Sequence, residues 1–117
     1  MNEIPATYTW LTDTQYRHLY PKMLLQVKKD FEFTGLTIDI SESTTPEELI
    51  KEVSYELYQL IQYKFDVFMQ LLYRIDIAEQ LMKSDEVESA EVLTEKATYQ
   101  VLKREWQKVE LRERFSK

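Results

Sequence analysis

The sequence predicts an all-α fold: a small helical bundle of three to four helices, with one long central helix and a short extended strap. The 117 residues include one glycine and three prolines, which leaves few places for the tight turns of a β-sandwich or barrel. Hydrophobic residues (44%) and charged residues (31%) are balanced as in a folded domain, and the hydrophobic ones recur at helical spacing. The length suits one domain, so we expect residues 1–117 to form a single helical domain.

The first predicted helix covers about residues 13–33. Its hydrophobic side chains share one helical face: Tyr16, Tyr20, Leu24, Val27 and Phe31. Pro21 lacks an amide hydrogen and its ring clashes with the preceding turn. We therefore expect a kink there, or a short helix ending near Leu19 and a second one starting at Lys22. Gly35 favours the left-handed conformation that ends helices.

Residues 36–40 alternate hydrophobic and polar side chains, which is the period of a β-strand. The sequence offers no second strand candidate, and a strand does not stand alone. The segment is then either an extended strap across the helices or an edge that pairs with its copy in a dimer. We favour the strap.

Residues 46–75 are predicted to form the long central helix. Thr45 is a good N-cap, Pro46 suits the first helical position, and Glu48 completes a capping box. The hydrophobic residues of this segment fall within an arc of about 160° at 100° per residue. An arc this wide needs two neighbouring helices. Lys64 lies inside it, so we expect this lysine at the rim of a helix contact, where it reaches water or an acid.

Two further helices follow. Asp76 and Glu79 have the spacing of a second capping box and predict a short helix over residues 77–82. The last helix is predicted over residues 86–114, with acids in its first turn and bases near its end. Trp106 shares one face of this helix with Tyr99, Leu102 and Val109, which indicates a core residue rather than a ligand contact.

The net charge of −6 hides a polarity along the chain. Residues 96–117 carry seven basic and three acidic side chains, whereas the remainder carries eight basic and eighteen acidic ones. The basic helix can pair with the acidic helices beside it, or it can bind an anionic partner. We favour internal pairing, and the negative net charge disfavours nucleic-acid binding.

The sequence has few residues that could carry out catalysis, so we predict that the protein is not an enzyme. No cysteine is present, and His18, the one histidine, has no serine near it in sequence. A single glycine excludes phosphate-binding loops and dinucleotide motifs. A di-iron bundle needs Glu-x-x-His on two helices, and neither copy exists. We therefore predict no cofactor, no metal and no identifiable small-molecule substrate.

The candidate interaction residues are Lys64, Tyr55, Tyr63, Arg104, Lys108 and Arg112. The two tyrosines fall away from the main hydrophobic arc, and tyrosine is common at contact surfaces. The basic residues lie among aromatic ones, a pattern that suits a partner protein, nucleic acid or an anionic membrane. The leading hypothesis is a non-enzymatic protein-interaction or structural module, whose partner is another protein or a second copy of the chain in a homodimer. The alternative is a nucleic-acid-associated regulator that uses the basic C-terminal helix.

The sequence also predicts where in the cell the protein resides. The N-terminus lacks a basic cluster ahead of a hydrophobic run, and the most hydrophobic stretch, residues 65–73, is broken by Asp66 and Gln70. We expect neither a signal peptide nor a membrane span, and hence a cytoplasmic protein. The segments 19–24 and 72–77, with residues 104–114, resemble a group of short uncharacterised bacterial helical proteins. This resemblance implies a bacterial cytosolic helical domain and assigns no activity or binding residue.

Overall fold

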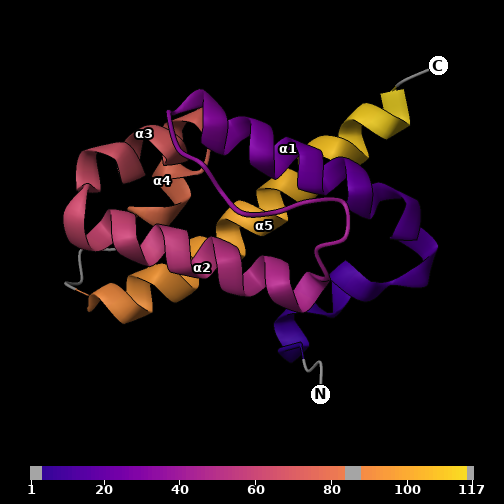
Figure 1. Ribbon diagram of the computed structural model, residues 1–117, viewed down its shortest axis with the longest axis horizontal. Helices are drawn as coiled ribbons and strands as arrows, with labels where there is room; N and C mark the ends of the chain where they lie inside the picture. The colour runs from indigo at the N-terminus through magenta and orange to yellow at the C-terminus, as the bar shows by residue number, and fades with distance from the viewer. Residues whose placement is uncertain (1–3, 84–87, 116–117) are drawn as a thin grey trace.

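The computed structural model describes residues 4–83 and 88–115. These residues form two 3-10 helices and five α-helices, and no strand (Figure 1). The elements are η1 (Ala6–Thr12), η2 (Thr14–Leu19), α1 (Tyr20–Phe33), α2 (Pro46–Tyr63), α3 (Phe65–Ile75), α4 (Ala78–Leu81) and α5 (Ala90–Phe115). The all-α class is confirmed. The number of helices in the described part of the chain exceeds the three to four of the predicted bundle.

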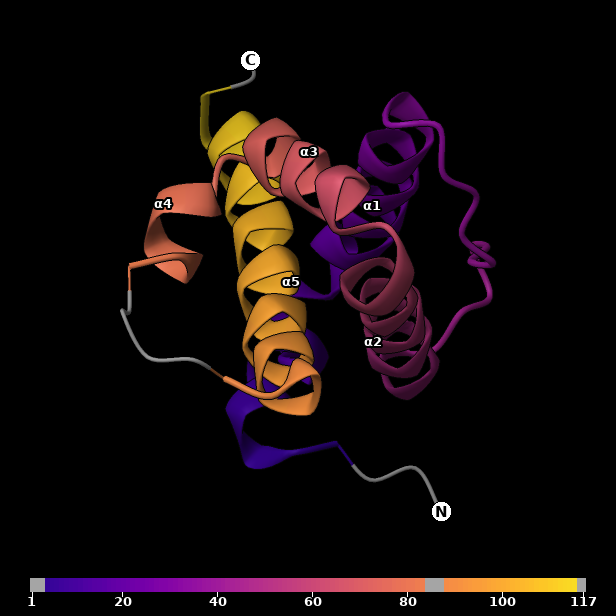
Figure 2. The ribbon, with the colours of Figure 1, turned by 90° about the vertical axis from the view of Figure 1, so that its left-hand side faces the viewer.

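The last helix, α5, occupies the centre of the fold. It contacts α1, α2, α3, α4 and η2. Figure 2 shows it between α4 on one side and α1 and α2 on the other. The prediction that the segment 46–75 forms the central helix is therefore wrong. The 26 residues of α5 give it the length to reach all the other helices.

The prediction of one continuous helix over residues 46–75 is also wrong. The helix breaks at Lys64, whose backbone (φ −145°, ψ 63°) is not helical, and the chain changes direction between α2 and α3 (Figure 1). The break loses little hydrogen bonding, because the Lys64 N–H donates to the Leu60 carbonyl (2.8 Å) and the Phe68 N–H donates to the Lys64 carbonyl (3.0 Å). No proline or glycine marks the position.

The broad hydrophobic arc of this segment has a simple explanation in the break. The buried residues of α2 and those of α3 lie on faces whose centres differ by about 50° at 100° per residue. They are Leu49, Val53, Leu57 and Leu60 in α2, and Phe68, Leu71, Leu72 and Ile75 in α3. In the sequence pattern, two helices with offset hydrophobic faces therefore look like one helix with a wide hydrophobic face. The bend directs both faces into the same core.

The start and the end of α1 follow the local signals. A 3-10 helix ends at Leu19 and α1 begins at Tyr20, so that Pro21 lies in the first turn, where no amide hydrogen is needed. At the other end Gly35 has φ 84°. The Gly35 N–H donates to the Glu32 carbonyl (3.0 Å) and the Leu36 N–H donates to the Phe31 carbonyl (3.0 Å), which is a Schellman motif. The predicted face included Tyr16, whose side chain lies outside the described part.

Residues 36–40 form the extended strap. Ile38 and Ile40 are buried, Asp39 between them is exposed, and the segment joins no sheet in the described chain. The predicted capping box closes the strap at α2: the Thr45 N–H donates to Glu48 Oε1 (2.9 Å) and the Glu48 N–H donates to Thr45 Oγ1 (3.2 Å). The Thr45 cap is confirmed in both halves.

The second capping box, predicted for Asp76, is wrong. Asp76 takes the left-handed conformation (φ 73°) and ends α3, with the Ile77 N–H donating to the Leu72 carbonyl (3.0 Å). Asp tolerates this conformation better than most residues. The short helix α4 therefore starts without a side-chain cap.

The last helix begins later than predicted, at Ala90. Ser89 caps it, since the Val92 N–H donates to Ser89 Oγ (3.1 Å). The predicted start at residue 86 lies outside the described residues. Trp106 is buried in the core, as its position on the hydrophobic face predicts.

Candidate functional site

The three basic candidates of the C-terminal helix make contacts within the fold. Arg104 Nε donates to the Ile75 carbonyl (3.3 Å), and Arg112 Nη2 donates to Gln26 Oε1 (2.8 Å). Lys108 Nζ lies 2.9 Å from Asp30 Oδ2. Lys108 thus pairs with an acid, and Arg104 Nη2 also lies 3.6 Å from Asp76 Oδ2, whereas Arg112 contacts a neutral amide. These contacts engage only part of each cationic group, and Arg112 stays exposed to solvent.

Lys108 belongs to a buried polar cluster that joins α1, α3 and α5. Asp30 at its centre is 1% exposed and accepts hydrogen bonds from Lys108, from Arg74 Nε (3.0 Å) and from Gln26 Nε2 (3.1 Å). Burial raises the pKa of Asp30, but hydrogen bonds from Glu105, Lys108 and Gln26 outweigh it, so the net pKa is lowered. Asp30 is therefore ionised at neutral pH.

Glu105 is the second acid of this cluster and is fully buried. Burial, together with the adjacent charge of Asp30, raises the pKa of Glu105 to about 9. Its Oε1 lies 3.3 Å from Lys108 Nζ, a contact too poorly oriented to hold a second negative charge in the core. Glu105 thus carries a proton at neutral pH.

Sequence reasoning missed this cluster, although a signal was present. Glu105 lies on the helical face of Leu102, Trp106 and Val109, where a charged residue is out of place. Since both acids are buried, no substrate reaches them. The cluster fixes how three helices pack and does not form a catalytic site.

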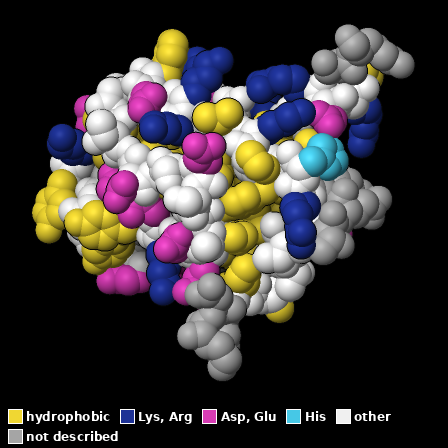
Figure 3. All heavy atoms as spheres, turned by 45° about the vertical axis from the view of Figure 1, so that its right-hand side comes forward, with side chains coloured by type: hydrophobic (Ala, Val, Ile, Leu, Met, Phe, Trp, Pro, Cys, Tyr) yellow, Lys and Arg dark blue, Asp and Glu magenta, His cyan; other side chains and the backbone are white. Residues whose placement is uncertain are grey.

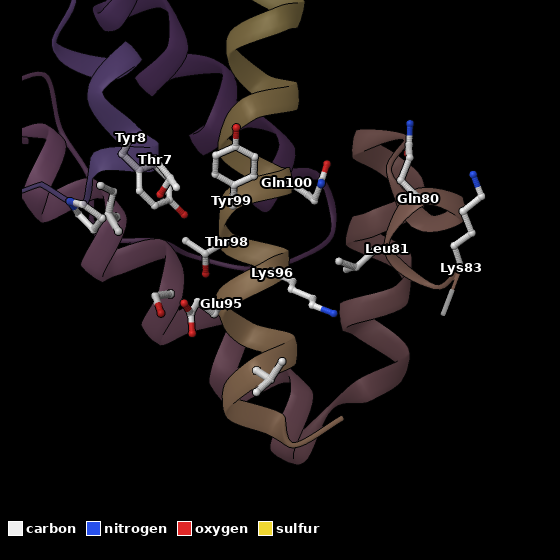
Figure 4. Close-up of a pocket in the computed structure, with 14 residues that line it drawn as sticks. Thr7, Tyr8, Gln80, Leu81, Lys83, Glu95, Lys96, Thr98, Tyr99 and Gln100 are labelled. Carbon is white, nitrogen blue, oxygen red and sulfur yellow. The ribbon is translucent and has the colours of Figure 1, made fainter. Parts of the chain in front are cut away.

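A different region offers room for a ligand. A hollow of about 860 Å³ opens between η1, α2, α4 and α5. Figure 4 shows Tyr8 of η1 beside Tyr99 of α5, and Leu81 of α4 on the other side of Lys96. The surface of the hollow is mostly apolar, although eight of its fourteen lining residues are polar or charged: Pro5, Thr7, Tyr8, Ile50, Ser54, Gln80, Leu81, Lys83, Val92, Glu95, Lys96, Thr98, Tyr99 and Gln100.

A second hollow of about 540 Å³ continues the first along α2 and α5. The two share Ile50, Ser54 and Glu95, and the second extends to Tyr55 and Tyr58. We call the two together the α2–α5 groove. Tyr55, one of the predicted interaction residues, stands in its wall with 59% of its surface exposed.

The aromatic end of the groove is held by ring contacts. The Tyr8 and Tyr99 rings lie 5.5 Å apart between centroids, and Trp10 contacts Tyr99 at 6.3 Å and Trp106 at 5.6 Å. Burial, with smaller contributions from Tyr99 and Glu95, raises the pKa of Tyr8 to about 12. The Tyr8 hydroxyl therefore stays protonated and can donate a hydrogen bond at this end of the groove.

The remaining candidates lie elsewhere. Tyr63 and Lys64 are both exposed at the corner between α2 and α3, and neither lines the α2–α5 groove. The structure thus brings one predicted residue, Tyr55, to the α2–α5 groove. It leaves two at a corner and directs three into internal contacts.

Comparison of the chain with protein-family models, with curated proteins and with solved structures found no match. The resemblance to short bacterial helical proteins stays a prediction. Among the residues that the structure describes, no group of three or more acids and histidines is placed to hold a metal ion. No helix in the same residues has the length and hydrophobicity needed to cross a bilayer.

Proposed function

We propose that this chain is a non-enzymatic protein-interaction module of a bacterial cytoplasm, and that its α2–α5 groove binds a peptide segment of a partner protein. The observation that carries the proposal is the groove itself. Two open hollows that share three lining residues adjoin each other along α2 and α5, which suits an extended or helical peptide better than a compact small molecule.

The lining of the groove supports the same partner. Ile50, Leu81 and Val92 provide hydrophobic surface, and Val92 is 42% exposed although it is a large hydrophobic residue. The four tyrosines of the groove present flat rings with polar tips, as protein interfaces commonly do. Charged groups of both signs, such as Glu95 and Lys96, also line the groove. A segment with two or three hydrophobic side chains and a mixed polar flank fits this lining.

The alternative function, a nucleic-acid-associated regulator, gains less support. Arg104, Lys108 and Arg112 already contact Ile75, Asp30 and Gln26 within the fold. Phosphates would have to compete with these contacts. Binding of a labelled duplex at low salt, steeply weakened by added salt, would favour this alternative over the interaction module.

The test of the proposed function is a comparison of matched variants. Val92→Lys and Tyr55→Lys place a charge in the groove. Leu111→Lys and Tyr73→Lys place the same charge on equally exposed hydrophobic residues outside it, since Val92 and Leu111 are 42% and 43% exposed and Tyr55 and Tyr73 are 59% and 69% exposed. Proteins captured from the source cell are quantified for all four variants and the original chain.

The expected result is at least one protein whose capture falls about tenfold or more with both groove variants and stays unchanged with both controls. The proposal fails if every captured protein responds equally to groove and control variants. It also fails if none of the four variants changes the capture of any protein.

A further inference from the structure

Two further hollows carry opposite charges. The first, of about 270 Å³, lies between α1 and α5. Its lining includes three basic residues, Lys22, Lys29 and Arg112, and one acid, Glu113, which gives a formal charge of +2. Leu25 stands in the same lining with 70% of its surface exposed. We call this region the basic hollow.

The second, of about 530 Å³, lies between the strap and α2. Its lining includes three acids, Asp39, Glu48 and Glu52, and one base, Lys51, which gives a formal charge of −2. Tyr55, which is 59% exposed, stands at its edge, where this hollow adjoins the α2–α5 groove. We call this region the acidic hollow. Its formal charge is equal and opposite to that of the basic hollow.

Elements of the two hollows lie next to each other. The Tyr20 hydroxyl, at the start of α1, donates to the carbonyl of Thr44, which lines the acidic hollow (2.7 Å). This bond holds the end of the strap beside the helix that carries Lys22. Figure 3 shows several Lys and Arg side chains at the upper right, near the histidine, and most of the visible acidic side chains at the left, where basic ones also lie, with hydrophobic side chains exposed between the two groups.

We propose that two copies of the chain pair through these two hollows around a two-fold axis, with the basic hollow of each copy against the acidic hollow of the other. A two-fold rotation exchanges the two halves of an interface, so a surface with one basic and one acidic half is complementary to itself. Leu25 and Tyr55 provide exposed hydrophobic contacts within the charged halves.

The net charge of −6 does not oppose this pairing strongly. Salt screens repulsion between exposed charges beyond about 8 Å at physiological ionic strength. Charges that meet across an interface lie closer than that and are partly removed from water. The two contacts between opposite hollows therefore dominate over the repulsion of the whole molecules, because each copy contributes one basic and one acidic hollow.

The pairing is tested by reversing the charge of each hollow. Lys22→Glu with Lys29→Glu changes the basic hollow from +2 to −2, and Asp39→Lys with Glu52→Lys changes the acidic hollow from −2 to +2. Lys28→Glu with Lys83→Glu is the matched control, because both lysines are exposed and neither lines either hollow. Molar mass is measured by sedimentation equilibrium up to about 1 mM protein.

We expect the original chain and the control to move from the monomer mass of 14.2 kDa to twice that mass as concentration rises. Each reversed variant alone brings like charges together at both contacts, and we expect its dissociation constant to rise about tenfold or more. An equimolar mixture of the two reversed variants pairs opposite charges at both contacts. The mixture should therefore associate as the original chain does.

Three results would overturn the proposal. The original chain could stay a monomer throughout, its mass could keep growing beyond a dimer, or the mixture could fail to associate although both variants show the original helical circular dichroism. If a double variant does not fold, Lys29→Glu and Asp39→Lys carry the same test, because each removes the net charge of its hollow. The mixture of these single variants should then associate more tightly than either alone.

Discussion

Glu105 makes the free energy of unfolding depend on pH in a direction opposite to that of most carboxyl groups. The folded chain keeps the Glu105 proton up to about pH 9, whereas the unfolded chain releases it above about 4.5. Between these values the folded state binds more protons, so rising pH favours the unfolded state. The contribution of Glu105 is full below pH 4.5 and is lost as pH rises to about 9.

The size of the effect follows from proton linkage. Each pH unit within this window lowers the free energy of unfolding by about 1.4 kcal/mol, which amounts to about 3 kcal/mol between pH 4.5 and neutral pH. Glu105→Gln removes the titration and keeps an amide that can donate to Asp30. We therefore expect this variant to be more stable than the original chain at neutral pH by up to about 3 kcal/mol.

The assay is urea unfolding followed by circular dichroism from about pH 5 to about pH 9. Asp30 has a lowered pKa, so its own contribution is lost in acid, below this window. Glu56 has a pKa raised by burial and then by Glu52, but it is present in both proteins and cancels in their difference. The control is Glu110→Gln, five residues further along α5. This variant should show the same dependence of the unfolding free energy on pH as the original chain. Parallel pH profiles for Glu105→Gln and the original chain would refute the assignment of a buried, protonated acid.

Three further predictions concern stability and are checked by urea unfolding at neutral pH. Thr45→Ala removes the side-chain half of the α2 cap and should lower the free energy of unfolding by about 1 kcal/mol; no change would mean that the cap is redundant. Asp76→Gly removes the strain of a left-handed backbone and should raise the free energy of unfolding by about 1 kcal/mol, although an exposed contact with Arg104 is lost. Phe68→Ala leaves a cavity at a fully buried position of α3 and should lower the free energy of unfolding by about 3 to 5 kcal/mol. A smaller loss would contradict the placement of α3 in the core.

The sequence is informative where one residue decides one local geometry. The Thr45 cap, the Gly35 turn and the change at Pro21 each depend on neighbours within a few positions, and the structure places all three as the local chemistry requires. The break at Lys64 has no such signal. It depends on which of two packings buries more surface, and helical spacing is nearly the same for one long helix and for two shorter ones.

Asp76 and Glu105 show two other limits of sequence reasoning. Asp76 can cap a helix start or end a helix in the left-handed conformation, and a sequence does not say which use prevails. Glu105 can be recognised as buried only when its partners are known, and Asp30 lies 75 positions away in the sequence. For the same reason the α2–α5 groove, which is assembled from four elements, could not be predicted beyond Tyr55.

The two tryptophans of the chain meet in a single contact, with ring centroids 5.6 Å apart. One belongs to η1 and the other to α5, so their shared emission reports how the N-terminal 3-10 segment is docked on the last helix. An event that lifts this segment would change the fluorescence while the helical content stayed constant. Because Tyr8 of the same segment lines the α2–α5 groove, we expect a peptide that binds there as proposed to change the intrinsic fluorescence.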